Sequence, residues 1–343
     1  MPSAFGGLMT RYVAGVVNYK TYDDLASCLE SLTRQTIPPA WIRVVDADGD
    51  PVQAEALAKR FPTVRWSLVP NRGFGAGANR FLAEGRADPY LPEAALLLNP
   101  DIELEPDYAE RLLDELRAHR SVALASGKLL RPCRTRIDSA GISLPRHRRP
   151  YDRGSFQLDH GQYDETERVF AVCGAAMMLR LSALGTLEVD GEVFDESFFA
   201  YREDTDLCWR ANLLGFDVLY VPAARAVHQR RWKPESAASR RAMPSAIRCH
   251  SFKNHCFQIL KNERASRLMR DLPVVAGFEA VRLAYALLWD RDLLPAYVDI
   301  VKQLPQMWSR RRAIFARRAA RLGESIPCPA VDVPGFAAEV ELA

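Results

Sequence analysis

The chain has 343 residues, of which 48% are hydrophobic and 26% charged, and its formal net charge at pH 7 is +3. This is the balance of a folded soluble protein with a sizeable core. So small a net charge does not indicate binding to nucleic acid. A chain of this length predicts one large domain with an appendage, or two domains.

Several features predict a cytoplasmic protein. The seven cysteines include no C-x-x-C pair, and Cys28, Cys173 and Cys208 fall in apolar or helical patterns, as reduced core thiols do. The amino-terminal sequence lacks the pattern of a secretion signal. No window of uncharged apolar residues is long enough to predict a membrane-spanning helix.

Strand and helix patterns alternate through the first hundred residues. Short apolar runs predict strands at 12–17, 41–45, 64–69 and 94–98. Helical spacing predicts helices around 25–32, 52–61 and 74–85. Alternation with short connections predicts parallel strands joined by right-handed crossovers, and therefore an α/β fold.

Polar residues follow each of these predicted strands. They are Asn18, then Asp46 and Asp48, then the segment 71–77, and finally Asp101. The carboxyl ends of parallel strands share one sheet edge, which is where open α/β sheets bind ligands. The acids from Asp46 onward could instead form only a turn that caps the next helix. Their coincidence with three other polar strand ends favours the functional interpretation.

Glycines at 73, 75 and 77 invite comparison with a dinucleotide-binding loop. Such a loop should follow the first strand of its unit, with an acid about 20 residues beyond it. Here the glycines follow the third strand and that spacing is absent. We therefore interpret them as residues that let a helix pack closely beside a ligand.

A second acidic motif opens a predicted helix with Glu203, Asp204 and Asp206. Three acids exceed what capping and the helix dipole require. We expect Asp206 to pair with Arg210 four residues later. A carboxylate that can hold a metal, such as Asp101, together with one that can accept a proton is what metal-assisted group transfer requires.

In this order, the motifs resemble those of the family-2 glycosyltransferases with a GT-A fold, in particular the bacterial rhamnosyltransferase-like branch. The resemblance runs from about Tyr12 to Trp232. The motifs that carry it are Val17-Asn18-Tyr19, Asn71 to Phe74 with Asn79, Leu98 to Asp101, Val172 to Met178, Phe194 to Phe199, Glu203 to Arg210, and Val221-Pro222 ahead of His228. One departure is Asp46-Ala47-Asp48-Gly49, where the family usually has D-N-x-S.

The resemblance implies a mixed, mainly parallel sheet flanked by helices, and it implies a role for each motif. Residues expected at the nucleotide-sugar donor are Asn18, Asp46, Asp48, Asn71, Gly73, Phe74, Asn79 and Asn99. Asp101 would bind Mg²⁺ or Mn²⁺, and His228 would complete that site or be structural. Because Asn99 replaces the first acid of the family's D-x-D, the metal site should depend on the nucleotide. Asp204 matches the family's base, with Glu203 beside it.

The resulting hypothesis is inverting transfer of a sugar from a dTDP- or UDP-sugar, with dTDP-L-rhamnose as the specific donor. The acceptor would be a polysaccharide or a polyprenyl-linked saccharide. A sugar-1-phosphate nucleotidyltransferase is disfavoured because no Gly- and Arg-rich phosphate loop follows the first strand. A non-catalytic sugar-binding module is disfavoured because Asp101, Glu203 and Asp204 are kept together. Gly174 to Ala176 would form a floor under the acceptor, or simply pack in a strand.

The last hundred residues change to helical spacing with basic amphipathic faces, including Arg310 to Arg321. We expect a catalytic domain at 1–235, a helical subdomain at 236–322 and a tail at 323–343. The subdomain would bind the inner face of the cell membrane or form a homodimer, or it would only pack on the catalytic domain. The arginine-rich segment 131–153 is predicted to be a mobile loop that contacts donor phosphate or an anionic acceptor, or that is only solvated.

Overall fold

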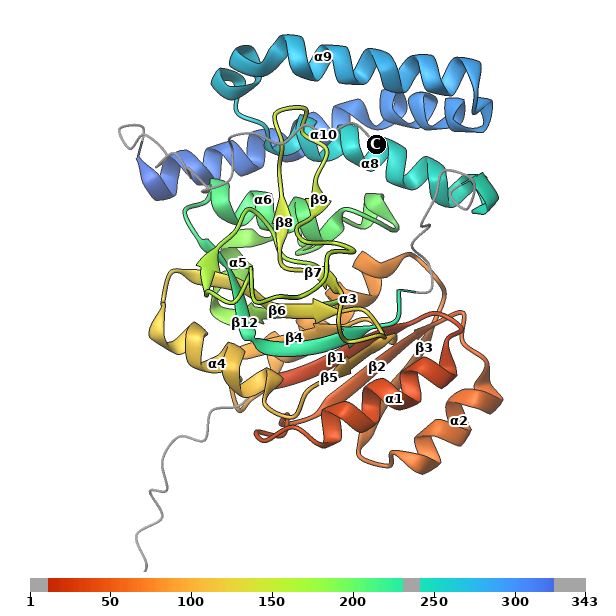
Figure 1. The fold of residues 1–343 in the computed structure, drawn as a ribbon, viewed down its shortest axis with the longest axis vertical. Coiled ribbons are helices and arrows are strands. Elements are labelled where there is room, and N and C mark those ends of the chain that lie inside the picture. Colours follow the sequence, from red (N-terminus) through yellow and green to blue (C-terminus); the bar gives the residue numbers. More distant parts are fainter. Residues whose placement is uncertain (1–11, 231–240, 324–343) are drawn as a thin grey trace, which may run out of the picture.

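The first hundred residues of the chain alternate strictly between strand and helix. The computed structural model describes residues 12–230 and 241–323 (Figure 1). The elements are β1 (Tyr12–Asn18), α1 (Tyr22–Thr33), β2 (Ile42–Ala47), α2 (Pro51–Arg60), β3 (Val64–Val69), α3 (Phe74–Ala87) and β4 (Ala94–Leu98). Each of the four strands and three helices lies where the sequence patterns predict it, so the α/β fold is confirmed.

The next part of the chain adds the rest of the sheet. Its elements are β5 (Ile102–Leu104), α4 (Tyr108–Ala118), β6 (Val122–Leu130), β7 (Ile137–Ser139), β8 (Ile142–Ser143), β9 (Tyr151–Asp152), β10 (Glu167–Arg168), β11 (Ala176–Arg180), α5 (Leu181–Leu187), η1 (Glu196–Phe198), α6 (Glu203–Leu213) and β12 (Asp217–His228). The strand order is β10-β12-β6-β11-β4-β1-β2-β3, with β5 on β12 and β7 on β6. β1 is parallel to both β2 and β4, whereas β11 runs antiparallel between β4 and β6.

Helices cover both faces of this sheet. One face packs against α1, α2 and α4, whose buried side chains include Leu29 and Leu112. The other packs against α3, α5 and α6, through side chains such as Phe81 and Leu207. Burial of each such side chain contributes about 1.5–3 kcal/mol. Because both faces are covered, the strand ends are the part of the sheet left open to a ligand.

Within the described residues 241–323, four helical elements follow the sheet: α8 (Ser245–Asn262), α9 (Ala265–Leu288), η2 (Arg291–Leu293) and α10 (Leu294–Leu322). They form a layer across one end of the sheet domain, with α8 next to α6 (Figure 1). Among the described residues, no single helix is long and apolar enough to cross a membrane; α9 and α10 pass that test only as a pair, across a bend of 117°. The expected tail beyond Gly323 lies outside the described residues.

The arginine-rich segment 131–153 is not the solvated loop expected from its sequence. It contains β7, β8 and β9, and two of its arginines are buried. Arg131 pairs with Asp138 at 3.0 Å, and Arg148 pairs with Asp271 of α9 at 2.9 Å. The segment lacks apolar periodicity because ion pairs and short strands, rather than an apolar face, hold it in place.

The arginines of α10 also differ from the sequence-based expectation, because they mostly face the protein. Arg310 is buried and pairs with Asp195 and Glu192. Arg318 and Arg321 donate to the backbone carbonyls of Leu213 and Leu214 at the end of α6, at 2.6 and 2.8 Å. These guanidinium groups therefore fasten α10 to the sheet domain.

Two glycines test this packing. A Cβ at Gly15 of β1 would overlap the ring of buried Phe81, whereas a Cβ at Gly277 of α9 would meet nothing within 4 Å. We predict that Gly15→Ala lowers stability by about 1–3 kcal/mol through overpacking. Gly277→Ala should be neutral or stabilising by about 0.5–1 kcal/mol, because alanine is the better helix former. Thermal unfolding of both variants measures this; an unchanged melting temperature for Gly15→Ala would contradict the packing of α3 on β1.

Candidate active site

The carboxyl ends of β1 and β2 are joined by a buried carboxylate. Asn18 and Asp46 are register partners, and the Asn18 amide donates to Asp46 Oδ1 at 2.8 Å. The Tyr22 hydroxyl donates to Asp46 Oδ2, also at 2.8 Å. Burial raises the pKa of Asp46, although both hydrogen bonds oppose the shift. The predicted neighbours thus lie together, and Tyr22 is a partner that the sequence patterns did not reveal.

A chain of hydrogen bonds continues along this edge to the end of β3. Asp48, exposed and at φ 47°, accepts from the backbone N–H of Asn71 at 2.9 Å. The Asn71 side chain in turn accepts from the N–H of Gly73 at 2.9 Å. Gly73 has φ 92°, and a Cβ there would overlap the backbone of Phe199. Only glycine therefore permits this turn against the 199 segment.

Phe74 and Asn79 of α3 both hold the segment that precedes the base motif. The N–H of Phe74 donates to the carbonyl of Phe199 at 2.8 Å. The Asn79 side chain donates to the carbonyl of Phe194 at 2.8 Å and accepts from its N–H at 2.9 Å. These contacts give both residues a structural role, and their assignment to the donor stays a prediction.

Asp101 and His228 meet where β4 and β12 end. His228 Nε2 lies 3.4 Å from Asp101 Oδ1, and the N–H of Gln229 donates to the Asp101 carbonyl at 3.0 Å. On its other side, His228 Nδ1 lies 2.9 Å from Asp138 Oδ2 of β7. Asn99, two residues before Asp101, is held through its backbone N–H, which donates to the carbonyl of Ala175 at 2.8 Å. The imidazole is thus held between two carboxylates.

The charges in this group depend on one another. Burial would raise the pKa of Asp101, but the hydrogen bond and charge of His228 outweigh it, and the pKa is lowered. Burial would lower the pKa of His228, but Asp101 and Asp138 outweigh it, and the pKa is raised. Arg230 adds a second cation, since its Nε donates to Asp138 at 2.7 Å. A carboxylate on the far nitrogen fixes the orientation of a histidine ring, as it does in many metal sites.

Protein ligands alone do not form a complete metal site here. Within residues 12–230 and 241–323, no group of three or more His, Cys, Asp or Glu side chains could hold a metal ion. Asp101 and His228 could supply two ligands on one side. Mg²⁺ and similar cations keep several positions for substrate phosphates and water. The pair therefore suits a metal that arrives with a phosphate-containing ligand.

The second acidic motif begins α6 and faces the turn that precedes β11. Asp204 Oδ2 accepts from the N–H of Gly174 at 2.9 Å, and Asp204 Oδ1 accepts from the N–H of Thr205 at 2.6 Å. A Cβ at position 174 would lie 2.9 Å from the Cβ of Asp204, which is too close. Gly174 is therefore required for the carboxylate to sit against this turn.

Glu203 and Asp204 differ in what stabilises their charge. The pKa of Glu203 is raised to about 8. Burial is the main cause of this rise, and the charge of the neighbouring Asp204 is the second. Burial also raises the pKa of Asp204, but the N–H groups of Gly174 and Thr205 oppose it. Glu203 Oε2 is buried without a hydrogen-bond partner. Burial therefore favours the protonated form of Glu203 at neutral pH, whereas the N–H groups of Gly174 and Thr205 favour the ionised form of Asp204.

Cys173 shows that the two halves of the site are neighbours. Burial raises the pKa of its thiol well above the usual value, and Asp204 and Asp138 are among the carboxylates that add to the shift. Asp138 belongs to the histidine group and Asp204 to the base motif. The turn at 174–175 also links them directly, since Ala175 accepts from the N–H of Asn99 at 2.8 Å and Gly174 donates to Asp204 at 2.9 Å.

Asp206 pairs with Arg210 as predicted, but its closer partners lie in another helix. Its distance to Arg210 is 3.7 Å, whereas Lys261 Nζ lies at 2.8 Å and the Asn262 amide donates to it at 2.7 Å. Both closer partners belong to α8. Asp206 therefore binds the C-terminal helices, a contact across 55 residues that no local spacing rule could predict.

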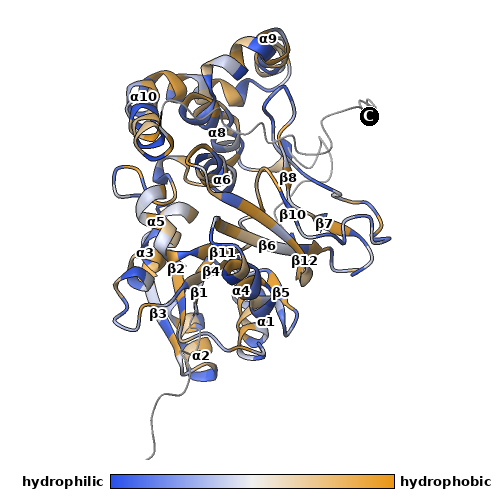
Figure 2. Cartoon of the chain, turned by 90° about the vertical axis from the view of Figure 1, so that its left-hand side faces the viewer, coloured by the Kyte–Doolittle hydropathy of each residue, from blue (hydrophilic) through white to orange (hydrophobic). Residues whose placement is uncertain are grey.

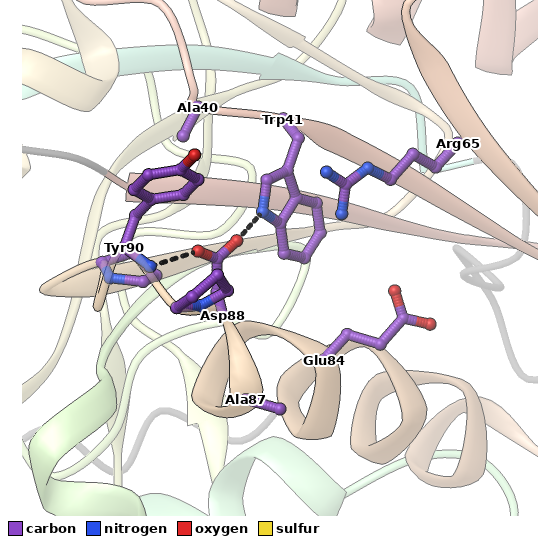
Figure 3. A pocket seen from close by; sticks show the side chains of 9 residues that line it. Ala40, Trp41, Arg65, Glu84, Ala87, Asp88 and Tyr90 are labelled. Carbon is purple, nitrogen blue, oxygen red and sulfur yellow. Dashed lines mark hydrogen bonds between the residues drawn. The ribbon is translucent and has the colours of Figure 1, made fainter.

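A cavity of about 460 Å³ lies away from these groups (Figure 3). Its lining includes Trp41, just before β2, and Asp88, just after α3, so it is at the amino ends of the strands. The Asp88 carboxylate accepts from the Trp41 indole at 2.6 Å and from the N–H of Tyr90 at 2.9 Å. Because it lies at the amino ends of the strands, this cavity is separate from the groups gathered at their carboxyl ends.

Similarity to known proteins agrees with this geometry. Residues 11–243 match the model of a glycosyltransferase-like family 2. An N-acetylglucosaminyl-diphospho-decaprenol L-rhamnosyltransferase of Mycobacterium tuberculosis is 29% identical over 239 residues, which are 62% of this chain and 74% of that protein. Rhamnosyltransferase WbbL of Escherichia coli is 44% identical over 55 residues, which are 16% of this chain and 19% of that protein.

Two solved structures share the fold at 13% identity. GalNAc-T7 with UDP, GalNAc and Mn²⁺ has a TM-score of 0.55, over 74% of this chain and 48% of its own, so this chain spans about half of that protein. Staphylococcus aureus TarS 1–349 in complex with UDP has a TM-score of 0.53, over 91% of this chain and 88% of its own. The family match decides against a nucleotidyltransferase. The chain therefore belongs to glycosyltransferase family 2 and is an enzyme of its rhamnosyltransferase-like branch.

Proposed function

We propose that this enzyme transfers L-rhamnose from dTDP-L-rhamnose to a lipid-linked saccharide, with inversion at the sugar and with a divalent metal. The observation that carries the proposal is that one turn joins both groups: the Ala175 carbonyl accepts from the N–H of Asn99, two residues before Asp101, at 2.8 Å, and the N–H of Gly174 donates to Asp204 at 2.9 Å. The donor sugar and the acceptor class rest on the name of the Mycobacterium tuberculosis relative, which acts on a decaprenol-linked acceptor.

Asp101 and His228 would hold Mg²⁺ or Mn²⁺. The donor set fits such an ion, because one carboxylate oxygen and one imidazole nitrogen face each other at 3.4 Å while Asp138 fixes the ring from behind. A bound cation would neutralise the charge that develops on the leaving diphosphate. The GalNAc-T7 structure, which contains Mn²⁺ and UDP, supports this use of the fold.

The remaining strand-end residues would bind the donor. They are Asn18, Asp46, Asp48, Asn71, Gly73, Phe74, Asn79 and Asn99. The departure at Ala47 and Gly49 falls within this set, between buried Asp46 and the cap residue Asp50, which accepts from the N–H of Val52 at 2.9 Å. Asp46 and Asp48 thus keep distinct positions, one inside the sheet edge and one facing solvent.

Asp204 would be the general base. Its two oxygens accept from the N–H groups of Gly174 and Thr205, which favour the ionised carboxylate and fix its orientation. A base on the face opposite the leaving diphosphate removes the proton of the acceptor hydroxyl as that oxygen attacks, which inverts the configuration. Protonated Glu203 would act beside it as a neutral hydrogen-bond donor.

The C-terminal helices would place the enzyme at the cytoplasmic face of a membrane. Large exposed apolar side chains gather on α9 and α10, where hydrophobic residues are interspersed with hydrophilic ones (Figure 2). They include Met269, Leu272, Val281, Leu287, Leu288, Trp289, Val298, Val301, Leu304 and Trp308. We call these residues the apolar face. The two charged residues between Leu272 and Asp290, Glu279 and Arg282, pair within the helical layer.

The domain assignment remains part of the proposal, with a catalytic domain at 1–235 and a helical subdomain at 236–322.

The same apolar face could instead bind a second copy of the chain as a homodimer. A membrane is favoured because Trp289 and Trp308 are side chains suited to the headgroup boundary. It is also favoured because a decaprenol-linked acceptor, as in the relative's name, resides in a membrane.

Donor binding should depend on Asp101 and prefer the rhamnosyl donor. We predict that, in Mn²⁺, dTDP-L-rhamnose binds more tightly than UDP-glucose, and that Asp101→Asn weakens binding at least about tenfold by removing a charged metal ligand. Isothermal titration measures both. Glu103→Gln is the matched control, since Glu103 in β5 lies near Asp101 but faces Gln229.

Equal losses in Asp101→Asn and Glu103→Gln would mean that general negative charge, and not metal ligation, explains the effect. Tighter binding of UDP-glucose would reject the rhamnosyl donor and leave the transferase assignment in place.

Asp204→Asn should keep donor binding and lose turnover. The amide is nearly isosteric but cannot accept a proton, so we expect a loss of about 10²–10⁴-fold in the release of dTDP from dTDP-L-rhamnose. Glu203→Gln mimics the protonated acid and should retain most activity. If Glu203→Gln is inactive and Asp204→Asn is active, the base is Glu203.

The raised pKa of Glu203 leads to a second prediction, that the stability of the protein depends on pH. The folded chain holds this proton up to about pH 8, whereas the unfolded chain releases it near the ordinary pKa of 4.5. At pH values between 4.5 and about 8, unfolding therefore releases a proton, and the free energy of unfolding falls as the pH rises through this range. Glu203→Gln removes this loss, so it should melt above the wild type at pH 8 and by a smaller margin at pH 5. Equal melting at both pH values would contradict the raised pKa.

The apolar face should bind lipid bilayers. Val281 is 67% exposed on α9, and Val52 is 76% exposed on α2 of the sheet domain. We predict that Val281→Asp lowers co-sedimentation with liposomes severalfold while Val52→Asp does not, because binding scales with buried apolar area. Since the α10 arginines face the protein, high salt should weaken binding only modestly. Wild-type protein that ignores liposomes but elutes as a dimer would show that the face is a subunit contact.

A further inference from the structure

The segment that leads into the base motif has an unfavourable backbone conformation. Phe199, Tyr201 and Arg202 have φ values of 62°, 70° and 72°. Residues other than glycine rarely adopt positive φ, and such conformations persist only where the surrounding contacts hold them. Arg202 directly precedes Glu203, where α6 begins. Whatever holds this segment therefore also sets the position of Glu203 and Asp204.

Asn254 of α8 contacts the middle of this segment. Its side chain has no exposed surface, and Nδ2 lies 2.8 Å from the carbonyl oxygen of Phe198 and 2.9 Å from those of Ala200 and Tyr201. An amide nitrogen carries two hydrogens, so three acceptors share them. The three carbonyls must therefore converge on one point, which only the turned backbone allows.

Lys261, two helical turns further along α8, contacts both sides of the segment. Its fully buried Nζ lies 2.5 Å from Asp195, before the segment, and 2.8 Å from Asp206, after it. Asn262 adds a bond to Asp206 at 2.7 Å. A buried cation needs its carboxylate partners, so the two aspartates cannot move apart without leaving charge uncompensated.

Contacts from the donor side complete the enclosure of the segment. The carbonyl of Phe199 accepts from the N–H of Phe74 at 2.8 Å, and its ring stacks on His250 of α8 at 4.7 Å. Lys253 Nζ also donates to the carbonyl of Ser197, at 2.5 Å. The segment is thus bound on one side by the donor-binding turn and on the other by α8.

We propose that Asn254 and Lys261 are positioning residues for sugar transfer, which hold residues 195–202 in the strained conformation that aims Asp204 at the acceptor. The inference rests on the proposed function of Asp204 and extends it to a helix outside the sheet domain. Both residues act through the backbone and through Asp195 and Asp206, and the helical layer is in this sense part of the catalytic machinery.

The main test is Asn254→Ala, with Asn212→Ala as its control. Asn212 is another helical asparagine, which lies on α6 and is partly buried. Its amide donates to the carbonyl of Phe170 at 2.7 Å. We expect Asn254→Ala to lower kcat for dTDP release by up to about 10²-fold, with the Kd for dTDP-L-rhamnose in Mn²⁺ nearly unchanged, because misplacement of a catalytic group costs rate rather than donor binding. Asn212→Ala should keep kcat.

Rescue by glycine separates positioning from a general loss of stability. Arg202→Gly and Arg202→Ala both remove the guanidinium, but only glycine adopts a φ of 72° without strain. In the Asn254→Ala background, Arg202→Gly should therefore restore part of the lost kcat, and Arg202→Ala should restore none. If Asn254→Ala folds poorly, the same comparison of glycine with alanine in the otherwise wild-type chain answers the question, with glycine retaining more activity.

Hydrogen exchange gives a readout that does not depend on turnover. Asn254→Ala should speed exchange of the backbone amides between 198 and 206 and leave those of β1 to β4 unchanged. Wild-type kcat in Asn254→Ala, equal activity of the two Arg202 variants, or unchanged exchange at 198–206 would each overturn the proposal. A wild-type enzyme that neither binds nor cleaves dTDP-L-rhamnose would overturn the donor assignment instead, and the exchange result would still decide on Asn254 and Lys261.

Discussion

A buried ammonium group links the two parts of this protein. Lys261 has no exposed surface and lies between Asp195 and Asp206, which are buried as well. Removing one partner of such a group leaves a charge in the interior, at a cost of about 3–5 kcal/mol. α8 therefore occupies its position only when the Asp195 segment and α6 occupy theirs. The C-terminal helices and the second acidic motif form one structural unit, although the sequence suggests an appended subdomain.

The sheet part of the fold was predictable because its signals are local. Four short apolar runs separated by helical spacing specify parallel strands, and parallel pairing brings the strand ends to one edge. The contact between Asn18 and Asp46 follows from that geometry alone, since the two are register partners in β1 and β2. Gly73 was also recognisable as a close-approach residue, though its neighbour Phe199 was not.

The missed residues depend on contacts between distant parts of the chain. Asp138 lies 90 residues before His228, in a segment without apolar periodicity, so no spacing rule connects them. The arginines of α10 illustrate a second limit. A basic run normally indicates a solvated face, but a guanidinium can also donate to helix-end carbonyls, as Arg318 and Arg321 do at the end of α6. Sequence alone does not distinguish these two uses.

The C-terminal layer has two faces with different chemistry. Its inner face combines ion pairs with apolar contacts such as Phe257 on Phe198, and through Asn254 it contacts the carbonyls that precede Glu203. Its outer face exposes apolar side chains such as Val281 and Trp308. Under the proposed function, a lipid-linked acceptor would come from a membrane on the outer side. The helices that meet the membrane would then be joined, through α8, to the carboxylate that accepts the proton, so that acceptor supply and base position are set by one rigid layer.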